Sequence, residues 1–200
     1  GQPEQSAQRE SSAQRSLYAK AKKLIASGER QKSRRYTADL IDYPLYPYLV
    51  YADLIADLRY NRRKEVADYL QRYSGSVKAK HLRARWLDYL ARRAYWTAYT
   101  EYYDPETASV GRQCNFYLAQ YRVGNKSVAM SEGLKLWTQG KSQPKTCDRL
   151  FGIIIKEGKI TEAVAWKRFN AALLAHNFQL ARYLKRFLKT DKYKKLHQLY

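Results

Sequence analysis

The chain has 200 residues, of which 45% are hydrophobic, enough to bury the core of one or two domains. Its 38 lysines and arginines exceed its 18 aspartates and glutamates, and the net charge of +20 attracts polyanions such as nucleic acid, anionic lipid or carboxylate-bearing cell-wall polymer. No run approaches the roughly 18 apolar residues that span a bilayer, so we expect a soluble chain without a membrane span.

Helical periodicity, interrupted by glycine and proline, predicts a series of short helices. The first covers about residues 12–27 and stops at Gly28. A basic loop at 30–35 and a short helical turn at 36–41 follow, and two prolines halt that turn. Further helices are predicted at 48–60, 64–73, 77–91, 95–103, 113–122, 127–138, 147–156, 161–175 and 178–188.

Segments of alternating β-branched residues between tight turns, which would predict strands, are missing from the sequence. Short helices that follow in pairs at similar intervals are typical of repeat proteins. We therefore predict an all-α fold, a right-handed α-superhelix or solenoid of about ten helices in short antiparallel pairs. Residues 1–16 form a polar N-terminal segment of this scheme, and residues 17–200 form the superhelical domain.

Few residues suggest chemistry of their own. Cys114 and Cys147 are too few for an all-cysteine metal site, so they form either a disulfide or two buried thiols. The three histidines, His81, His176 and His197, are isolated from one another and from other metal ligands, and are expected to be surface or packing residues. We expect no metal site, no catalytic triad and no cofactor.

Asp53 and Asp57 lie one helical turn apart, so they could form a carboxylate pair for acid–base chemistry or for a cation. Arg59, Arg62 and Arg63 follow closely, and ion pairs on the surface or between helices explain the same residues more simply. No catalytic residue is therefore assigned.

The helix predicted at 77–91 has two distinct faces. Leu82, Trp86, Tyr89 and Leu90 share one face, which is expected to join the core. Arg85 and Arg92 lie on another face with His81 and Asp88. This second face is either solvated or contacts a ligand, and Arg85 and Arg92 are the candidate substrate contacts.

Two longer stretches go beyond a helical pattern. Residues 42–49 read DYPLYPYL and residues 142–151 read SQPKTCDRLF. Together they resemble the soluble lytic murein transglycosylase family, whose U-shaped helical domain carries both segments. The resemblance covers about residues 17–188, and it assigns a structural role to Tyr43, Pro44, Tyr46, Pro47, Gln143, Pro144, Asp148 and Phe151.

The resemblance implies a disulfide between Cys114 and Cys147, because the family's two cysteines in this region pair. It implies export to the periplasm of a Gram-negative bacterium, and a parent enzyme that cleaves the MurNAc–GlcNAc bond of peptidoglycan to 1,6-anhydro products. This chain corresponds to its superhelical scaffold, part of a larger ring, with peptidoglycan and the parent's catalytic domain as partners. The Glu-Ser start of a lysozyme-like domain has only a chance counterpart at Glu10-Ser11, so we expect that domain to be absent from these 200 residues.

A second hypothesis treats the chain as a basic α-solenoid that binds RNA or an acidic protein. The basic stretch at 182–195 contains aromatic residues, as nucleic-acid-binding segments often do. However, their spacing also fits the apolar stripe of a helix, and this hypothesis leaves both motifs and the cysteine spacing unexplained. We therefore expect no specific nucleic-acid partner.

Overall fold

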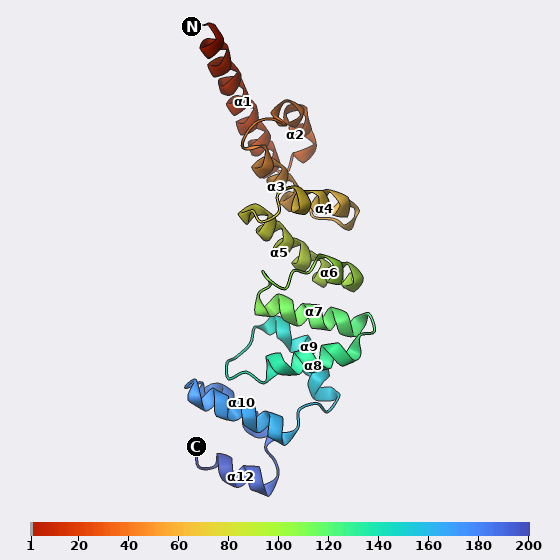
Figure 1. Cartoon of the computed structure of the whole chain (residues 1–200), viewed down its shortest axis with the longest axis vertical. Helices are drawn as coiled ribbons and strands as arrows, with labels where there is room; N and C mark the ends of the chain where they lie inside the picture. The colour runs from red at the N-terminus through yellow and green to blue at the C-terminus, as the bar shows by residue number, and fades with distance from the viewer. Residues whose placement is uncertain (1) are drawn as a thin grey trace. The chain divides into compact units, whose positions relative to one another are not determined.

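The computed structural model describes the backbone of residues 2–200 and the side chains of residues 12–200. All regular secondary structure in this part is helical, so the predicted all-α fold is confirmed (Figure 1). The chain divides into two compact units, Gly1–Tyr89 and Leu90–Tyr200. No helix in the described part is long and apolar enough to cross a membrane.

The first unit contains five α-helices and two 3-10 turns. Their bounds are α1 Gln2–Ala26, α2 Arg30–Thr37, η1 Ala38–Leu40, α3 Tyr46–Ala56, η2 Tyr60–Arg62, α4 Arg63–Arg72 and α5 Val77–Arg92, the last of which ends in the second unit. A glycine with φ +83°, Gly28, lets the chain turn between α1 and α2. The core of α1, η1 and α3 is formed by Ala21, Ile25, Leu40 and Leu49.

The second unit contains the remaining helices. Their bounds are α6 Trp96–Tyr102, α7 Val110–Arg122, α8 Lys126–Trp137, η3 Lys145–Cys147, α9 Asp148–Lys156, α10 Glu162–Leu174, α11 Phe178–Leu184, η4 Lys185–Phe187 and α12 Asp191–His197. Consecutive helices pack in pairs, α7 against α8 and α10 against α11. One continuous core joins them, with Trp137, Leu150, Ile154 and Phe169 at its centre.

Several helix predictions differ from the structure. Helix α1 begins at Gln2 rather than near Ser12, because its early Gln, Glu, Arg and Ala residues favour helix without forming an apolar stripe. The predicted basic loop at 30–35 is helix α2, which packs on α1 and buries Ser33. Helix α12 was not predicted, and Pro47 lies in the first turn of α3 instead of before it, a position where proline is tolerated.

Candidate functional site

The second unit contains a groove of about 710 Å³ beside the SQPKTCDRLF segment. Three residues of that segment that were predicted to matter, Gln143, Asp148 and Phe151, line this groove. Ser142, the first residue of the segment, lines it too. The other lining residues come from the end of α8 and from α9, α10 and α11: Trp137, Gly152, Ile155, Arg168, Gln179, Leu180 and Tyr183. The sequence motif is therefore one wall of a surface hollow.

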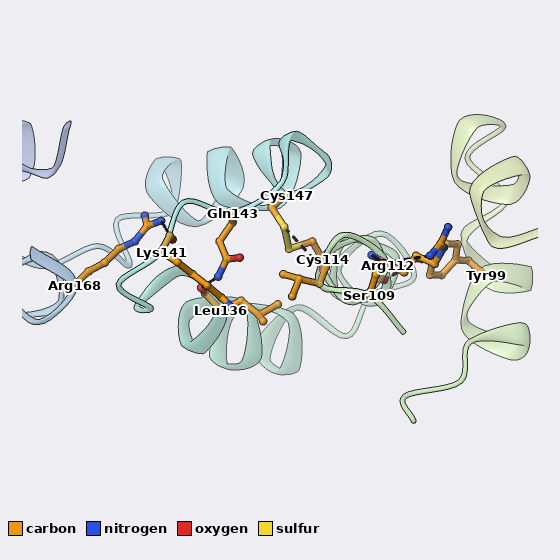
Figure 2. Close-up of a disulfide and its surroundings, with 10 residues drawn as sticks. Tyr99, Ser109, Arg112, Cys114, Leu136, Lys141, Gln143, Cys147 and Arg168 are labelled. Carbon is orange, nitrogen blue, oxygen red and sulfur yellow. Dashed lines mark hydrogen bonds between the residues drawn. A yellow bond between two sulfur atoms is a disulfide. The ribbon is translucent and has the colours of Figure 1, made fainter. Parts of the chain in front are cut away.

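Hydrogen bonds fix the motif against the helix before it. The Gln143 side-chain amide donates to the carbonyl of Leu136 over 3.1 Å, as Figure 2 shows. The carbonyl of Pro144 accepts from the backbone N–H of Cys147 at 2.9 Å, which forms the turn η3. Proline suits this turn because its fixed φ needs no further ordering and its missing N–H is not required there.

A disulfide holds the other end of the motif. Cys114 in α7 and Cys147 in η3 are bonded, with Cα atoms 5.1 Å apart, and both residues are buried (Figure 2). The bond links the start of the α7–α8 pair to the start of α9. It therefore anchors the groove wall that Asp148 and Phe151 provide.

Arg168 is the most unusual residue of the groove. It is only 3% exposed, although its side chain carries a charge. Its Nε donates to the carbonyl of Gln139 at 2.9 Å and its Nη2 to the carbonyl of Lys141 at 3.3 Å. Its guanidinium lies over the ring of Trp137, 4.7 Å from the centroid, an arrangement that favours a cation. Arg168 thus fastens the 139–141 loop to α10.

Burial opposes the charge of this guanidinium. It lowers the pKa of Arg168 to about 10, while Tyr183 acts in the opposite direction. Arginine stays protonated at neutral pH even so, and the positive charge remains at the groove. Among the described side chains, no carboxylate forms an ion pair with Arg168.

Among the described residues that line the groove, Asp148 is the one carboxylate. Asp148 is exposed, at the first position of α9. The part of the chain with described side chains also contains no group of three His, Cys, Asp or Glu that could hold a metal ion.

The DYPLYPYL segment lies in the first unit and packs there. The ring of Tyr43 is 5.5 Å from that of Tyr18, and the carbonyl of Pro47 accepts from the Tyr69 hydroxyl at 3.0 Å. Tyr46 is partly buried and begins α3, whereas Pro44 is exposed in the preceding turn. These contacts give the segment a packing role at the α1–α3 and α3–α4 junctions.

Asp53 and Asp57 form ion pairs between helices, as the simpler of the two interpretations predicted. Arg30 bonds to Asp53 at 3.2 Å and to Asp57 at 3.4 Å, and Arg62 bonds to Asp53 and to Glu65. A hydrogen bond from Arg59 and further positive charges lower the pKa of Asp57. The two carboxylates are thus neutralised by arginines.

The remaining predicted residues occupy simple environments. Arg85 and Arg92 are both exposed on α5, so they are accessible to a ligand. His81 and His176 are exposed, and His197 is buried against Phe169, with ring centroids 6.4 Å apart. The core face predicted for this helix is confirmed, with Leu82, Trp86 and Leu90 fully buried and Tyr89 partly so.

Arg168 was missed by the sequence reasoning, although one signal was present. It stands three residues after Ala165 and next to Phe169, and both of those residues are buried. An arginine in phase with the buried face of a helix is rare unless it has partners, because the charge is costly to bury. The partners themselves, nearly thirty residues earlier, had no sequence signal.

The fold and the groove define a class of protein: an all-helical protein of short helix pairs with a hollow on its surface. No protein-family model matches the chain. The soluble lytic murein transglycosylase of Escherichia coli strain K12 is 31% identical over 164 residues, 82% of this chain and 25% of that protein. The corresponding protein of Salmonella typhimurium is 30% identical over the same length.

Solved structures agree with these relatives. The 70 kDa soluble lytic transglycosylase of Escherichia coli matches with a TM-score of 0.80 and 28% identity, over 94% of this chain and 30% of that one. An inactive mutant of the lytic transglycosylase Slt from Pseudomonas aeruginosa matches with a TM-score of 0.77 and 36% identity, over 86% of this chain and 28% of that one.

The predicted resemblance is therefore confirmed: this chain is homologous to a segment of the soluble lytic murein transglycosylases. The predicted fold class, an α-superhelix of short helix pairs, is confirmed by the same structural matches. The chain spans about a quarter of the length of the curated relatives that it matches.

Proposed function

We propose that this chain is a non-catalytic, substrate-holding scaffold of a periplasmic lytic murein transglycosylase. In this proposal the parent enzyme cleaves the MurNAc–GlcNAc bond of peptidoglycan to 1,6-anhydro products, and its catalytic domain lies outside these 200 residues. The observation that carries the proposal is the similarity to lytic murein transglycosylases over 82% of the chain. The disulfide supports the periplasm, because disulfides persist in oxidising compartments.

Electrostatics supports a role in holding substrate. Peptidoglycan stem peptides carry carboxylates, and the chain carries a net charge of +20. Arg85 and Arg92 are exposed on α5 and are proposed as contacts. Attraction between exposed charges is screened over a Debye length of about 8 Å at physiological salt, so binding should weaken as salt rises. Binding of RNA or an acidic protein is not favoured, because the relatives carry the name of a murein enzyme.

Sedimentation with purified sacculi tests the proposal. The chain should co-sediment at low salt and be released between about 0.05 and 0.5 M NaCl, as screening shortens the range of the charges. Arg85→Ala/Arg92→Ala should bind less at every salt concentration, and Lys32→Ala/Arg72→Ala, which removes two exposed charges elsewhere, is the matched control. Analysis of the supernatant should find no 1,6-anhydromuropeptides above a no-protein blank.

Two results would contradict the proposal. Sacculi that fail to sediment the chain even at low salt would remove the substrate-holding role. Release of 1,6-anhydromuropeptides would show that these 200 residues contain an active site of their own.

A further inference from the structure

In the groove of the second unit, the buried Arg168 forms no ion pair with any of the described carboxylates. Arg168 is only 3% exposed. It donates hydrogen bonds to two backbone carbonyls, and its guanidinium lies over one aromatic ring. Nε makes one of these hydrogen bonds and Nη2 makes the other. Nη1 donates no hydrogen bond to any of the described residues. Because an uncompensated buried charge is costly, an anion that reaches this group from the groove would be bound favourably.

The walls beside Arg168 suit a flexible organic anion more than a bare ion. Trp137, Phe151 and Tyr183 offer aromatic and apolar surface, and Gln143 and Gln179 offer amide groups. Ligand sites commonly combine apolar walls with a few placed polar groups. A guanidinium is also well matched to a carboxylate, since it can present two parallel N–H donors.

Asp148 adds a second requirement. Its carboxylate lines the same groove and would repel a ligand that carries negative charge alone. A peptide satisfies both groups, because it has a carboxylate for Arg168 and N–H or ammonium groups for Asp148. RNA would bring its phosphates close to Asp148, and its backbone has no cationic group to offset that repulsion.

We propose that this groove binds a carboxylate-bearing peptide, with Arg168 as the anchor of the carboxylate and Asp148 as the acceptor for a peptide N–H or ammonium group. The chemistry of the site requires only a peptide with a free carboxylate. Naming that peptide as the stem peptide of peptidoglycan rests on the function proposed above. The groove would then hold substrate by a specific contact, in addition to the diffuse attraction of exposed charges.

Arg168 itself is a poor position for a test, because its bonds also hold the 139–141 loop and its loss would disturb the fold. Gly152 is better placed. It lines the groove on α9, is exposed, and an added Cβ there would meet nothing within 4 Å. Gly152→Glu introduces a carboxylate into the groove, and Gly152→Gln is the neutral variant of the same size.

The experiment titrates the ¹⁵N-labelled 200-residue chain with a soluble disaccharide–tetrapeptide from sacculi, as the free acid and with its carboxyls amidated. Wild type should bind the free acid with shifts at groove residues, and should bind the amidated form at least about tenfold more weakly, the loss expected for a charge-assisted hydrogen bond. Gly152→Glu should bind the free acid at least about fivefold more weakly than Gly152→Gln, since like charges repel.

Equal affinity for the two probes, equal affinity of the two Gly152 variants, or no binding of the free acid would each overturn the inference. If sacculi still sediment the chain in those cases, the proposed function stands without this site. If sacculi fail to bind while the free acid does bind, the carboxylate site is supported and the proposed function fails.

Discussion

Gly140 is the position where one added methyl group should do the most damage. It lies in the loop after α8, and a Cβ built on it would be 2.5 Å from both the carbonyl carbon and the oxygen of Ala171 in α10. Those atoms are backbone, so no side-chain rotation relieves the overlap. In Gly140→Ala the loop must therefore move away from α10.

The movement would break further contacts. Arg168 donates to the carbonyls of Gln139 and Lys141, the two neighbours of Gly140, so a displaced loop weakens both bonds at once. Overpacking in a tight contact lowers the free energy of unfolding by about 1–3 kcal/mol. Because Gly140→Ala also weakens two hydrogen bonds from a charged donor, we expect a loss at the upper end of that range, about 3 kcal/mol. It should also weaken peptide binding in the groove.

Gly152→Ala is the matched control, because it adds the same methyl group to open space inside helix α9. Replacing a helical glycine in this way should stabilise the protein by about 0.5–1 kcal/mol. Urea unfolding followed by tryptophan fluorescence measures both free energies. If Gly140→Ala unfolds within about 0.5 kcal/mol of wild type, the close approach of this loop to α10 is not what the structure indicates.

Three further changes test other contacts. Reduction of the Cys114–Cys147 disulfide should lower the free energy of unfolding by about 3.7 kcal/mol in the chain-entropy model for 33 residues, and an unchanged urea midpoint in dithiothreitol would contradict it. Arg62→Ala should lower the free energy of unfolding by about 3–5 kcal/mol, because Arg62 is buried against the carboxylates of Asp53 and Glu65. Arg72→Ala loses one exposed ion pair and should lower it by under about 1 kcal/mol. Equal urea midpoints of the two variants would contradict this difference. Burial raises the pKa of Tyr69 to about 12, so the contribution of Tyr69 to stability should be constant below pH 10 and fall between pH 10 and 12, as the unfolded phenol ionises. Tyr69→Phe should reduce this alkaline fall in urea titrations, and an equal fall in both proteins would contradict the prediction.

Much of the fold could be predicted because local signals agree with it. Glycines and prolines separate the helices, and the 3.6-residue period selected the buried face of α5 at Leu82, Trp86 and Leu90. Helix α2 was missed because its one fully buried residue is Ser33 and Tyr36 is its one aromatic contact with the core, too little for an apolar stripe. Its packing against α1 decides its structure instead.

The candidate groove, like the fold, could be predicted from the sequence only in part. One wall could be predicted from the sequence, since the SQPKTCDRLF segment is a run of neighbouring residues that includes Gln143, Asp148 and Phe151. The position of Arg168 beside this wall depends on tertiary packing, since its bonds go to carbonyls 27 and 29 residues earlier, in the loop just before the segment. Helical periodicity reports which face of a helix is buried, but not which loop covers it, because that choice depends on how α8, α9 and α10 pack together.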